Sequence, residues 1–415
     1  MKIVIFACAD FPEGPATTSR IKLLSRILTL AGHDVSLAIF NANARNPIPE
    51  NACTNGDFES IHYRYLSGKT FRPRSFPGKL SDTVKGIVNS VSYLREYKRH
   101  GLVDAVIFYT PGIYRSVPTF LLARIFRIPI LLELCEIFSF DMRKSGINSM
   151  VKRFGSQISD RVLPGKSSGI LAISTRIIDF LKGHGVEDSK ILHLPILVDH
   201  DRFAKPASSP VPVLAGKRYF LNSGALDEKE GLEHILDAFA AVSKNAGQIF
   251  LAITGSPDQR RKEFVFERAK HLNIEDQLLF TGFLSSDQLS WAYQNAIALL
   301  CCRANTPFAN FGFPTKLAEY LSSGRPVISN EVGDMLLYLK DGENAFFAKA
   351  EDSGSIARQM TRILDSPQLA SHVGANGQKT AADCFDYRNF VLTVDEFIRS
   401  ICRESGGSPA SGKAV

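Results

Sequence analysis

A carboxylate and an ammonium group stand close together in the stretch FGFPTKLAEYLSSGRPVI, residues 311–328. The pattern predicts a Gly/Pro turn, a short helix and a strand, with Lys316 and Glu319 on the first helical turns. A carboxylate near a helix N-terminus can simply interact with the helix dipole. It can also bind a ligand hydroxyl while the backbone N–H groups of the same N-terminus bind a phosphate. Both interpretations of Glu319 are open from these residues alone.

Two further loops are predicted at the same edge of a parallel sheet. The stretch GALDEKEGL, residues 224–232, carries Lys229 ahead of a predicted helix, and TGFLSSDQ, residues 281–288, joins a strand to a helix. In a doubly wound sheet, ligands bind at the carboxyl ends of the strands. A single lysine there is more often a surface charge, but several cations with helix N-termini suit a diphosphate. The three loops together favour a phosphate-binding site.

Several other motifs are absent from the sequence. No G-x-G-x-x-G follows the first predicted strand, which disfavours a nicotinamide dehydrogenase. The stretch PGKSS, residues 164–168, lacks the earlier glycine of a P-loop, because that position is Asp160. There is no zinc spacing, no G-x-S-x-G elbow and no nucleic-acid-binding module. We therefore expect neither a metal nor a nucleic acid partner.

Apolar runs alternate with amphipathic segments along the whole chain, beginning with a strand, a helix at 20–33 and a second strand. This rhythm predicts an α/β fold of two doubly wound halves with parallel sheets. A capping box at Ser285–Gln288 predicts the start of a helix that runs to residue 296. The predicted strands are 2–9, 34–40, 103–111, 128–138, 169–175, 218–226, 249–256, 277–284, 297–303 and 325–331.

The length of 415 residues favours two domains. The Pro/Ser-rich segment 203–217 is interpreted as the linker between them. The predicted domains are 1–205 at the N-terminus and 206–384 at the C-terminus. A helix at 385–403 could return to the N-terminal domain, and the polar residues 404–415 are expected to form a disordered tail.

Charge is distributed unevenly between the halves. Residues 1–205 hold 28 Lys and Arg against 18 Asp and Glu, a net +10, and the remainder holds 21 against 24, a net −3. The basic half favours anionic partners such as nucleotides or an acidic membrane surface, although a solvated basic surface is the simpler explanation. For the apolar stripe of a long predicted helix at 76–101, core packing is the commoner explanation and a membrane-contacting face is the alternative.

The seven cysteines are scattered rather than spaced as a disulfide framework. No signal peptide and no membrane-spanning run is recognisable. We therefore expect a cytoplasmic protein, with peripheral association at the inner face of the membrane as an option.

Four stretches, in this order, resemble the retaining nucleotide-sugar glycosyltransferases of family 4. The resemblance implies the GT-B fold, in which two Rossmann-like domains face each other across a cleft. The stretches are GILAISTRIIDFLKGHG with KILHLPILVDHDRF, SGALDEKEGLEHILDAF, LLFTGFLSSDQLSWAYQNAIALL and FGFPTKLAEYLSSGRPVI.

By this resemblance, Glu319 would bind the ribose, because two carboxylate oxygens match two vicinal hydroxyls. Lys229 and Lys316 would act in catalysis by stabilising charge on the leaving diphosphate. The other implied donor-binding residues are Gly14 and Gly224 near the phosphates, Gly312, Phe313 and Thr315 at the diphosphate and donor sugar, and Phe283 and Leu284 at the base.

The chain departs from the family pattern at two positions. The family usually has a glutamate eight residues before Glu319 and an arginine in the glycine loop, where this chain has Phe311 and Ala225. These departures indicate either a sub-type or a loss of activity. In the first half, Glu133 and Glu136 end a predicted strand and are candidates to hold an acceptor or donor hydroxyl, with Glu136 expected to be catalytic. A surface carboxylate and a helix cap are the structural alternatives.

The resemblance implies a retaining glycosyltransferase that moves a sugar from a nucleotide-sugar, UDP- or GDP-linked, to a glycan or lipid-linked acceptor in cell-envelope polysaccharide synthesis. No metal or other cofactor is expected. One alternative is a nucleotide-sugar epimerase of the same build, for which Glu133 and Glu136 are the visible acid/base candidates. Another is a non-catalytic nucleotide-sugar-binding protein, which the residues at Phe311 and Ala225 favour.

Overall fold

The computed structural model describes residues 1–44, 46–109, 113–140, 147–224, 230–255 and 259–405, without the side chains of 113–115, 147–154 and 158. The chain divides into two compact units. Unit 1 comprises Met1–Pro195 with Tyr387–Val415, and unit 2 comprises Ile196–Asp386. The boundary after Pro195 precedes the Pro/Ser-rich segment 203–217, which lies within unit 2.

Unit 1 contains an eight-stranded sheet in the order β3-β4-β2-β1-β5-β6-β7-β8. Its strand pairs are parallel except for β3 with β4. The strands are β1 Lys2–Ala7, β2 Asp34–Ile39, β3 Asn55–Phe58, β4 Ile61–Tyr65, β5 Ala105–Tyr109, β6 Ile130–Leu134, β7 Gly169–Ala172 and β8 Ile191–His193. The strands β1 and β5 to β7 are almost wholly buried, as expected for parallel strands covered on both faces.

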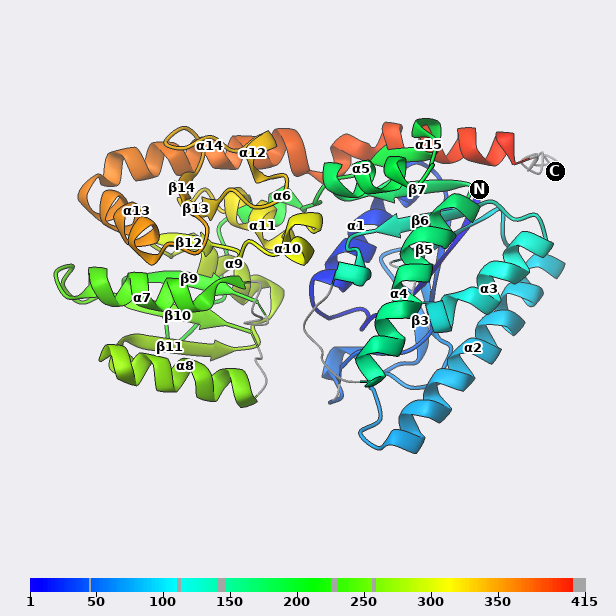
Figure 1. Ribbon diagram of the computed structural model, residues 1–415, viewed down its shortest axis with the longest axis horizontal. Coiled ribbons are helices and arrows are strands. Elements are labelled where there is room, and N and C mark those ends of the chain that lie inside the picture. Colours follow the sequence, from blue (N-terminus) through cyan, green and yellow to red (C-terminus); the bar gives the residue numbers. More distant parts are fainter. Residues whose placement is uncertain (45, 110–112, 141–146, 225–229, 256–258, 406–415) are drawn as a thin grey trace. The chain divides into compact units, whose positions relative to one another are not determined.

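Helices cover this sheet on both sides (Figure 1). The helix α1 packs against α15, while α2 packs against α3 and α3 against α4. The chain after residue 387 therefore folds with unit 1. The helices of unit 1 are α1 Ala16–Leu30, α2 Phe76–Arg99, α3 Ile113–Ile125, α4 Ile147–Lys166, α5 Thr175–Gly183 and α15 Val391–Glu404.

Unit 2 contains a six-stranded sheet in the order β11-β10-β9-β12-β13-β14, and its strand pairs are parallel. The chain first extends the sheet from β9 toward β11 and then from β12 toward β14. The sheet therefore changes its direction of growth between β9 and β12. The strands are β9 Tyr219–Ser223, β10 Phe250–Thr254, β11 Leu278–Gly282, β12 Ala298–Cys301, β13 Val327–Asn330 and β14 Phe346–Ala348.

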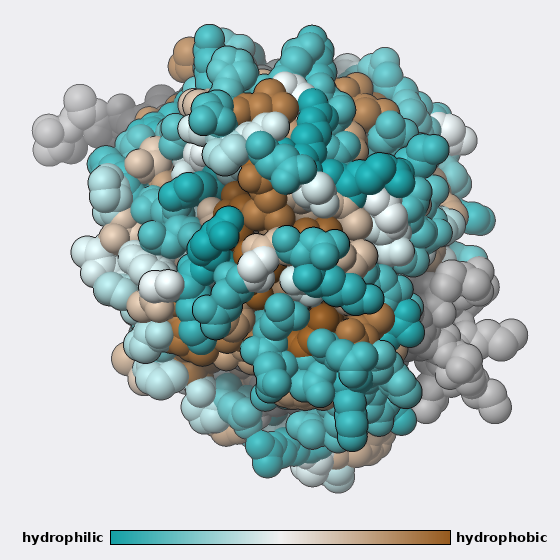
Figure 2. Space-filling model, turned by 90° about the vertical axis from the view of Figure 1, so that its left-hand side faces the viewer, coloured by the Kyte–Doolittle hydropathy of each residue, from teal (hydrophilic) through white to brown (hydrophobic). Residues whose placement is uncertain are grey.

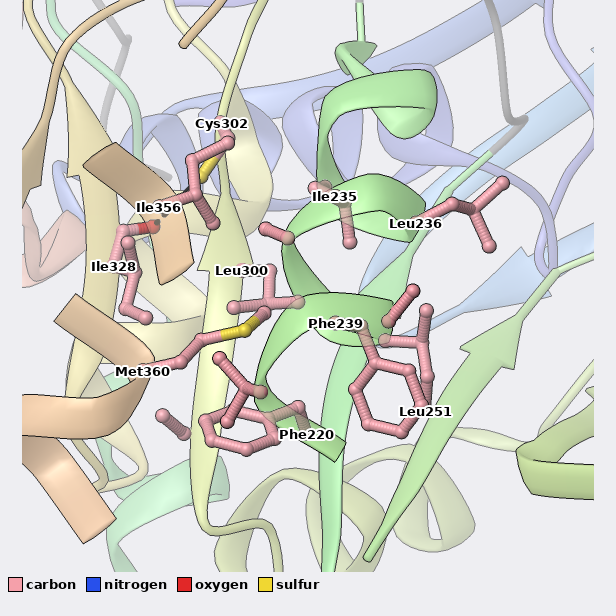
Figure 3. Packing of buried hydrophobic residues seen from close by; sticks show 14 of the residues in the cluster. Phe220, Ile235, Leu236, Phe239, Leu251, Leu300, Cys302, Ile328, Ile356 and Met360 are labelled. Carbon is pink, nitrogen blue, oxygen red and sulfur yellow. Dashed lines mark hydrogen bonds between the residues drawn. The ribbon is translucent and has the colours of Figure 1, made fainter. Parts of the chain in front are cut away.

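The core of unit 2 lies between this sheet and helices that include α7, α8 and α13. In Figure 3, Phe220 and Leu300 of the sheet meet Phe239 of α7 and Met360 of α13. Burying side chains of this size stabilises the fold by roughly 1.5–3 kcal/mol each. The helices α11 and α14 pack on each other. The helices are α6 His200–Ala204, α7 Leu232–Ser243, α8 Gln259–Leu272, α9 Ser286–Gln294, α10 Pro307–Phe311, α11 Thr315–Ser322, α12 Met335–Tyr338, α13 Ser353–Asp365 and α14 Pro367–Phe385.

The predicted α/β fold with two parallel-sheet halves is confirmed. Every strand predicted from an apolar run is present, although each is shorter, as β6 at Ile130–Leu134 shows against the predicted 128–138. The helix predicted at 20–33 begins earlier, at Ala16. None of the described helices has the length and apolar character needed to cross a membrane. On the face of unit 2 seen in Figure 2, hydrophilic side chains cover most of the surface and apolar ones occupy smaller areas between them.

Candidate functional site

The carboxyl ends of β9 and β12 flank the point where the sheet of unit 2 changes direction, which we call the switch point. Ligands of doubly wound folds bind at such a point, beyond the carboxyl ends of the strands. The helix α7 begins directly against it, because its N-cap residue Gly231 lies beside the carbonyl of Cys302. A Cβ atom on Gly231 would lie 2.2 Å from that oxygen, and the residue has a φ of 62°. Only glycine permits this approach, which brings a helix N-terminus to the switch point.

Lys316 reaches the switch point from the first turn of α11. Its Nζ atom donates to Asn222 Oδ1 at 3.2 Å and to the Ser223 carbonyl at 3.0 Å, at the end of β9. It also forms an ion pair with Glu230, which precedes α7. Burial opposes the charge of this lysine, but Glu230 offsets that effect and raises the pKa of Lys316 above its ordinary value. Lys316 therefore ties α11 to β9 and to the start of α7.

Glu319 lies in the second turn of α11, since the helix begins at Thr315. The helix dipole acts mainly within the first turn, so this position disfavours an interaction of Glu319 with the dipole. The hydroxyl of Tyr293 donates to Glu319 Oε2 at 3.5 Å. Burial raises the pKa of Glu319, while the charge of Arg202 and the Tyr293 hydrogen bond act in the opposite direction. The result is a half-buried carboxylate held on one side by a tyrosine.

Two tyrosines fix the end of β9 below this carboxylate. Ser223 donates its backbone N–H to the Tyr320 hydroxyl at 2.8 Å. The Ser223 Oγ atom lies 2.9 Å from the hydroxyls of both Tyr293 and Tyr320. Because these contacts join β9, α9 and α11, they hold the Glu319 backbone in register with the switch point.

Two buried donors at the switch point have no acceptor among the described residues. They are Asn222 Nδ2, at the end of β9, and Arg303 Nε, directly after β12. The other side of the Arg303 guanidinium donates to the carbonyls of Ala309 at 2.9 Å and Gly312 at 3.1 Å. A buried donor without an acceptor costs free energy unless a ligand supplies one. Two such donors, one of them cationic, suit an anion.

The structure brings only some of the predicted donor-binding residues to the switch point. Gly224 directly follows β9 with a φ of 132°, a conformation that favours glycine. Gly312 caps α10 and accepts from Arg303, and Thr315 opens α11. Lys229 lies outside the described residues, as does Ala225.

The remaining predicted donor residues lie elsewhere in unit 2. Phe313 is buried and stacks on Tyr338 with ring centroids 5.6 Å apart, so its ring belongs to an aromatic cluster of the core. Phe283 and Leu284 follow the edge strand β11, which β10 separates from β9. Phe283 is 61% exposed.

In unit 1, the predicted Gly14 lies in the loop after β1. A Cβ atom there would lie 2.9 Å from the Asp10 carbonyl and 2.3 Å from Thr18 Oγ1, so the loop closes tightly only with glycine. Of the two carboxylates near the end of β6, Glu136 is half-buried. Glu133 is fully buried and forms an ion pair with Arg20 at 2.7 Å. This ion pair occupies Glu133 Oε1 with a buried guanidinium and disfavours the predicted role of this carboxylate in holding a substrate hydroxyl.

Sequence reasoning missed Arg303, Asn222, Glu230 and the two tyrosines. Arg303 had a usable signal, since it is a polar residue at the carboxyl end of a predicted strand, whereas Asn222 lies in the middle of the strand predicted at 218–226. The pairing of Glu230 with Lys316 had none, because 86 residues separate them in the chain.

Residues 206–380 match the family model described as glycosyl transferases group 1. Among curated relatives, the mannosylfructose-phosphate synthase of Agrobacterium fabrum is 21% identical over 56% of this chain and 53% of its own length. The MMP alpha-(1->4)-mannosyltransferase of Mycolicibacterium hassiacum is 24% identical over 62% of this chain and 58% of its own length. The matched part thus spans little more than half of these relatives. These matches confirm the predicted resemblance at the level of the group 1 glycosyl transferases, and family 4 with its retaining reaction stays a prediction.

Solved structures resemble nearly the whole chain. The sucrose-phosphate synthase of Thermosynechococcus elongatus superposes with a TM-score of 0.75 at 16% identity, covering 97% of this chain and all of that one. HepE of Anabaena, solved in complex with UDP-glucose, gives a TM-score of 0.69 at 16% identity, with 96% and 99% of the two chains covered. These likenesses confirm the predicted GT-B fold.

Proposed function

We propose that this chain, whose residues 206–380 match the group 1 glycosyl transferases, moves a sugar from a nucleotide-sugar donor to an acceptor. The observation that carries the proposal is the switch point of unit 2. Two helix N-termini, the unpartnered donors of Asn222 and Arg303 and the half-buried Glu319 come together there. A diphosphate requires donors and positive charge, and a ribose requires an acceptor. The described groups supply both.

The donor would bind with its ribose on Glu319 and its diphosphate near Arg303 and Lys316. Lys316 forms an ion pair with Glu230. Arg303, Lys316 and Glu230 together therefore carry a net charge of about +1 at neutral pH. Lys229, predicted for the same role, would add a second positive charge. A UDP-sugar is favoured because HepE of Anabaena was solved with UDP-glucose, and a GDP-sugar is the alternative.

We infer a retaining transfer in which the chain positions both substrates. The bond between the anomeric carbon and the diphosphate oxygen breaks, and a bond to the acceptor oxygen forms on the same face. The acceptor proton passes to the leaving diphosphate oxygen, so no protein base is required. The catalytic contribution of Arg303, Lys316 and Lys229 is then to stabilise charge on the leaving group. No metal is included in this proposal.

The acceptor is proposed to be a glycan or lipid-linked sugar of the cell envelope. Support comes from WaaG, described as a glycosyltransferase involved in lipopolysaccharide biosynthesis, which has a TM-score of 0.66 to this chain at 13% identity. Glu136 is proposed to hold an acceptor hydroxyl. The proposed location is cytoplasmic, with an acidic membrane surface at the inner face as a second partner.

The epimerase alternative loses support from the geometry of unit 1. Such an enzyme would need two acid/base carboxylates near its substrate, and Glu133 is committed to Arg20. The non-catalytic alternative stays open as an outcome of the test.

The decisive experiment is calorimetric titration of the full chain with UDP, GDP, ADP and CMP, alongside Glu319→Gln. Glu275→Gln is the matched control, because Glu275 is an exposed glutamate of the same unit. We expect one nucleotide to bind, Glu319→Gln to weaken that binding about tenfold and Glu275→Gln to leave it unchanged. Binding of none of the four would contradict the proposed function.

Turnover assays with the nucleotide-sugar of the base so identified then separate the alternatives. Conversion of the donor without an acceptor would indicate an epimerase. Binding without turnover over a broad acceptor panel would indicate the non-catalytic protein. Acceptor-dependent release of the nucleoside diphosphate is the result expected for a transferase.

A further inference from the structure

Up to Ser90, the long helix α2 packs on unit 1 through small and polar residues, and Tyr93 and Leu94 complete its inner face. Its buried residues are Asp82, Gly86, Ser90, Tyr93 and Leu94. Asn41 Nδ2 donates to the Asp82 carboxylate at 2.7 Å. A Cβ atom on Gly86 would lie 2.4 Å from the carbonyl oxygen of Phe40. The helix therefore lies so close to the end of β2 that the inner face has no room for larger side chains at these positions.

Four of the large apolar residues of α2 point to solvent instead. Phe76, Leu80, Val84 and Val88 recur every fourth residue, and their exposed fractions are 78%, 55%, 50% and 56%. Residues at this spacing lie on one side of a helix, where they form a continuous row that we call the α2 stripe. The expectation that core packing explains the apolar residues of this helix is thus wrong for the stripe.

Positive charge surrounds the α2 stripe. Between residues 69 and 99 the exposed charged side chains are eight cations and one carboxylate, Glu96. The other carboxylate of this segment, Asp82, is buried on the inner face. The cations are Lys69, Arg72, Arg74, Lys79, Lys85, Arg95, Lys98 and Arg99.

Further charged and apolar side chains lie near the α2 stripe. Near the end of α2, Arg95, Arg99 and His100 line a shallow surface pocket of about 300 Å³, together with Ser92 and Glu96. The neighbouring helix α3 adds the exposed Leu121 and Ile125, at 53% and 73%. Apolar side chains set among cations are the composition of a helix that lies in the headgroup region of a bilayer.

We propose that α2 docks unit 1 on a bilayer that contains acidic lipids. Phe76, Leu80, Val84 and Val88 enter the boundary between headgroups and acyl chains, and the surrounding cations contact lipid phosphates. This proposal deepens the membrane location given under the proposed function. It does not depend on donor binding, since the switch point lies in unit 2 and α2 in unit 1.

Charge separates this occupant from a second copy of the chain. Two copies meeting through their stripes would bring eight cations and one carboxylate against the same set, and like charges at close range repel. An acidic bilayer instead attracts each lysine or arginine near its surface by about 1 kcal/mol, a factor of about five in binding.

The test is co-sedimentation of the full chain with phosphatidylcholine vesicles, with and without phosphatidylglycerol. We expect the protein to sediment with the acidic vesicles and to be released by salt. The double variant Phe76→Ser/Leu80→Ser should bind the acidic vesicles at least about tenfold more weakly than the wild type. The double variant Lys79→Glu/Lys85→Glu should lose the salt-sensitive binding to these vesicles. Leu392→Ser is the matched control, because it removes a 75% exposed leucine from α15 of the same unit.

Thermal unfolding checks that each variant is folded, and nucleotide titration of the same samples reports on the donor site independently. The proposal is overturned by equal binding to acidic and neutral vesicles, by absence of binding, or by stripe variants that bind as the wild type does. A concentration-dependent dimer that the stripe variants dissociate would also overturn it and would assign the surface to a second copy.

Discussion

Lys316 and Glu230 form an ion pair at the carboxyl end of β9, although they come from the first turn of α11 and the residue before the N-cap of α7. Each side chain is only 12% exposed. The lysine implied to contact the diphosphate is therefore also the connection between two helix N-termini. Its role in positioning the switch point can be separated from any role in catalysis.

Removal of either partner should destabilise unit 2. Lys316→Met leaves the Glu230 carboxylate without its cation, and breaking a buried pair in this way costs about 3 kcal/mol. The double variant Lys316→Met/Glu230→Gln should cost much less than the sum of the two single variants. Urea denaturation of the four proteins measures this coupling. Additive free energies of unfolding would show that the pair contributes nothing of its own.

Donor binding should depend on pH through Glu319. Burial raises the pKa of this carboxyl group, so it takes up a proton at a higher pH than an exposed glutamate does. A protonated carboxyl has less capacity to accept hydrogen bonds from ribose hydroxyls. Nucleotide affinity should therefore fall as the pH is lowered through the raised pKa, and Glu319→Gln should flatten this part of the profile. Parallel profiles for both proteins, measured by titration calorimetry, would remove Glu319 from the binding site.

Local sequence signals predicted local structure well in this chain. The capping box at Ser285 and Gln288 is present, with both of its reciprocal hydrogen bonds. The apolar runs identified the strands, because parallel strands buried on both faces need continuous apolar sequence. The switch point was also within reach, because it requires only that strand ends with polar residues share an edge.

Tertiary context decided what the sequence left open. Apolar periodicity in α2 shows that one side differs from the other, but it does not show which side faces the sheet. That choice depends on Gly86 and Asp82, whose fit against Phe40 and Asn41 exists only in the folded unit. In the same way, the buried ion pair between Arg20 and Glu133 could not be predicted, because 113 residues separate them in the chain. The position of Glu133 near a strand end gives no sign of this partner.

The close approach of Gly231 to β12 should be the more costly of two glycine substitutions in unit 2. Gly231 and Gly247 have nearly equal φ values, 62° and 67°, but a Cβ on Gly247 would meet nothing within 4 Å. Gly247→Ala should therefore cost about 1 kcal/mol, the strain of a left-handed backbone alone. Gly231→Ala adds a collision with the Cys302 carbonyl and should cost about 3 kcal/mol or more. Equal losses of stability in urea would show that α7 does not lie against β12 as described.

Asp160 should make the stability of unit 1 fall as the pH rises. Burial raises the pKa of this carboxyl group to about 6, although its Oδ2 atom accepts the backbone N–H of Ser139 at 2.8 Å. Between the unfolded value of 3.8 and this folded value, the native state retains a proton that the unfolded state has released. The free energy of unfolding therefore decreases through that window, and the loss is complete above about pH 6.

The variant Asp160→Asn isolates this contribution, because its amide oxygen can still accept from Ser139 but does not titrate. From pH 4 to pH 7, the free energy of unfolding of the wild type should fall by up to about 3 kcal/mol relative to that of the variant. Asp179→Asn, at an exposed position of the same unit, is the control and should follow the wild type. Urea denaturation at each pH gives these differences. A constant difference between wild type and Asp160→Asn would mean that the carboxyl group is ionised equally in the folded and unfolded chains.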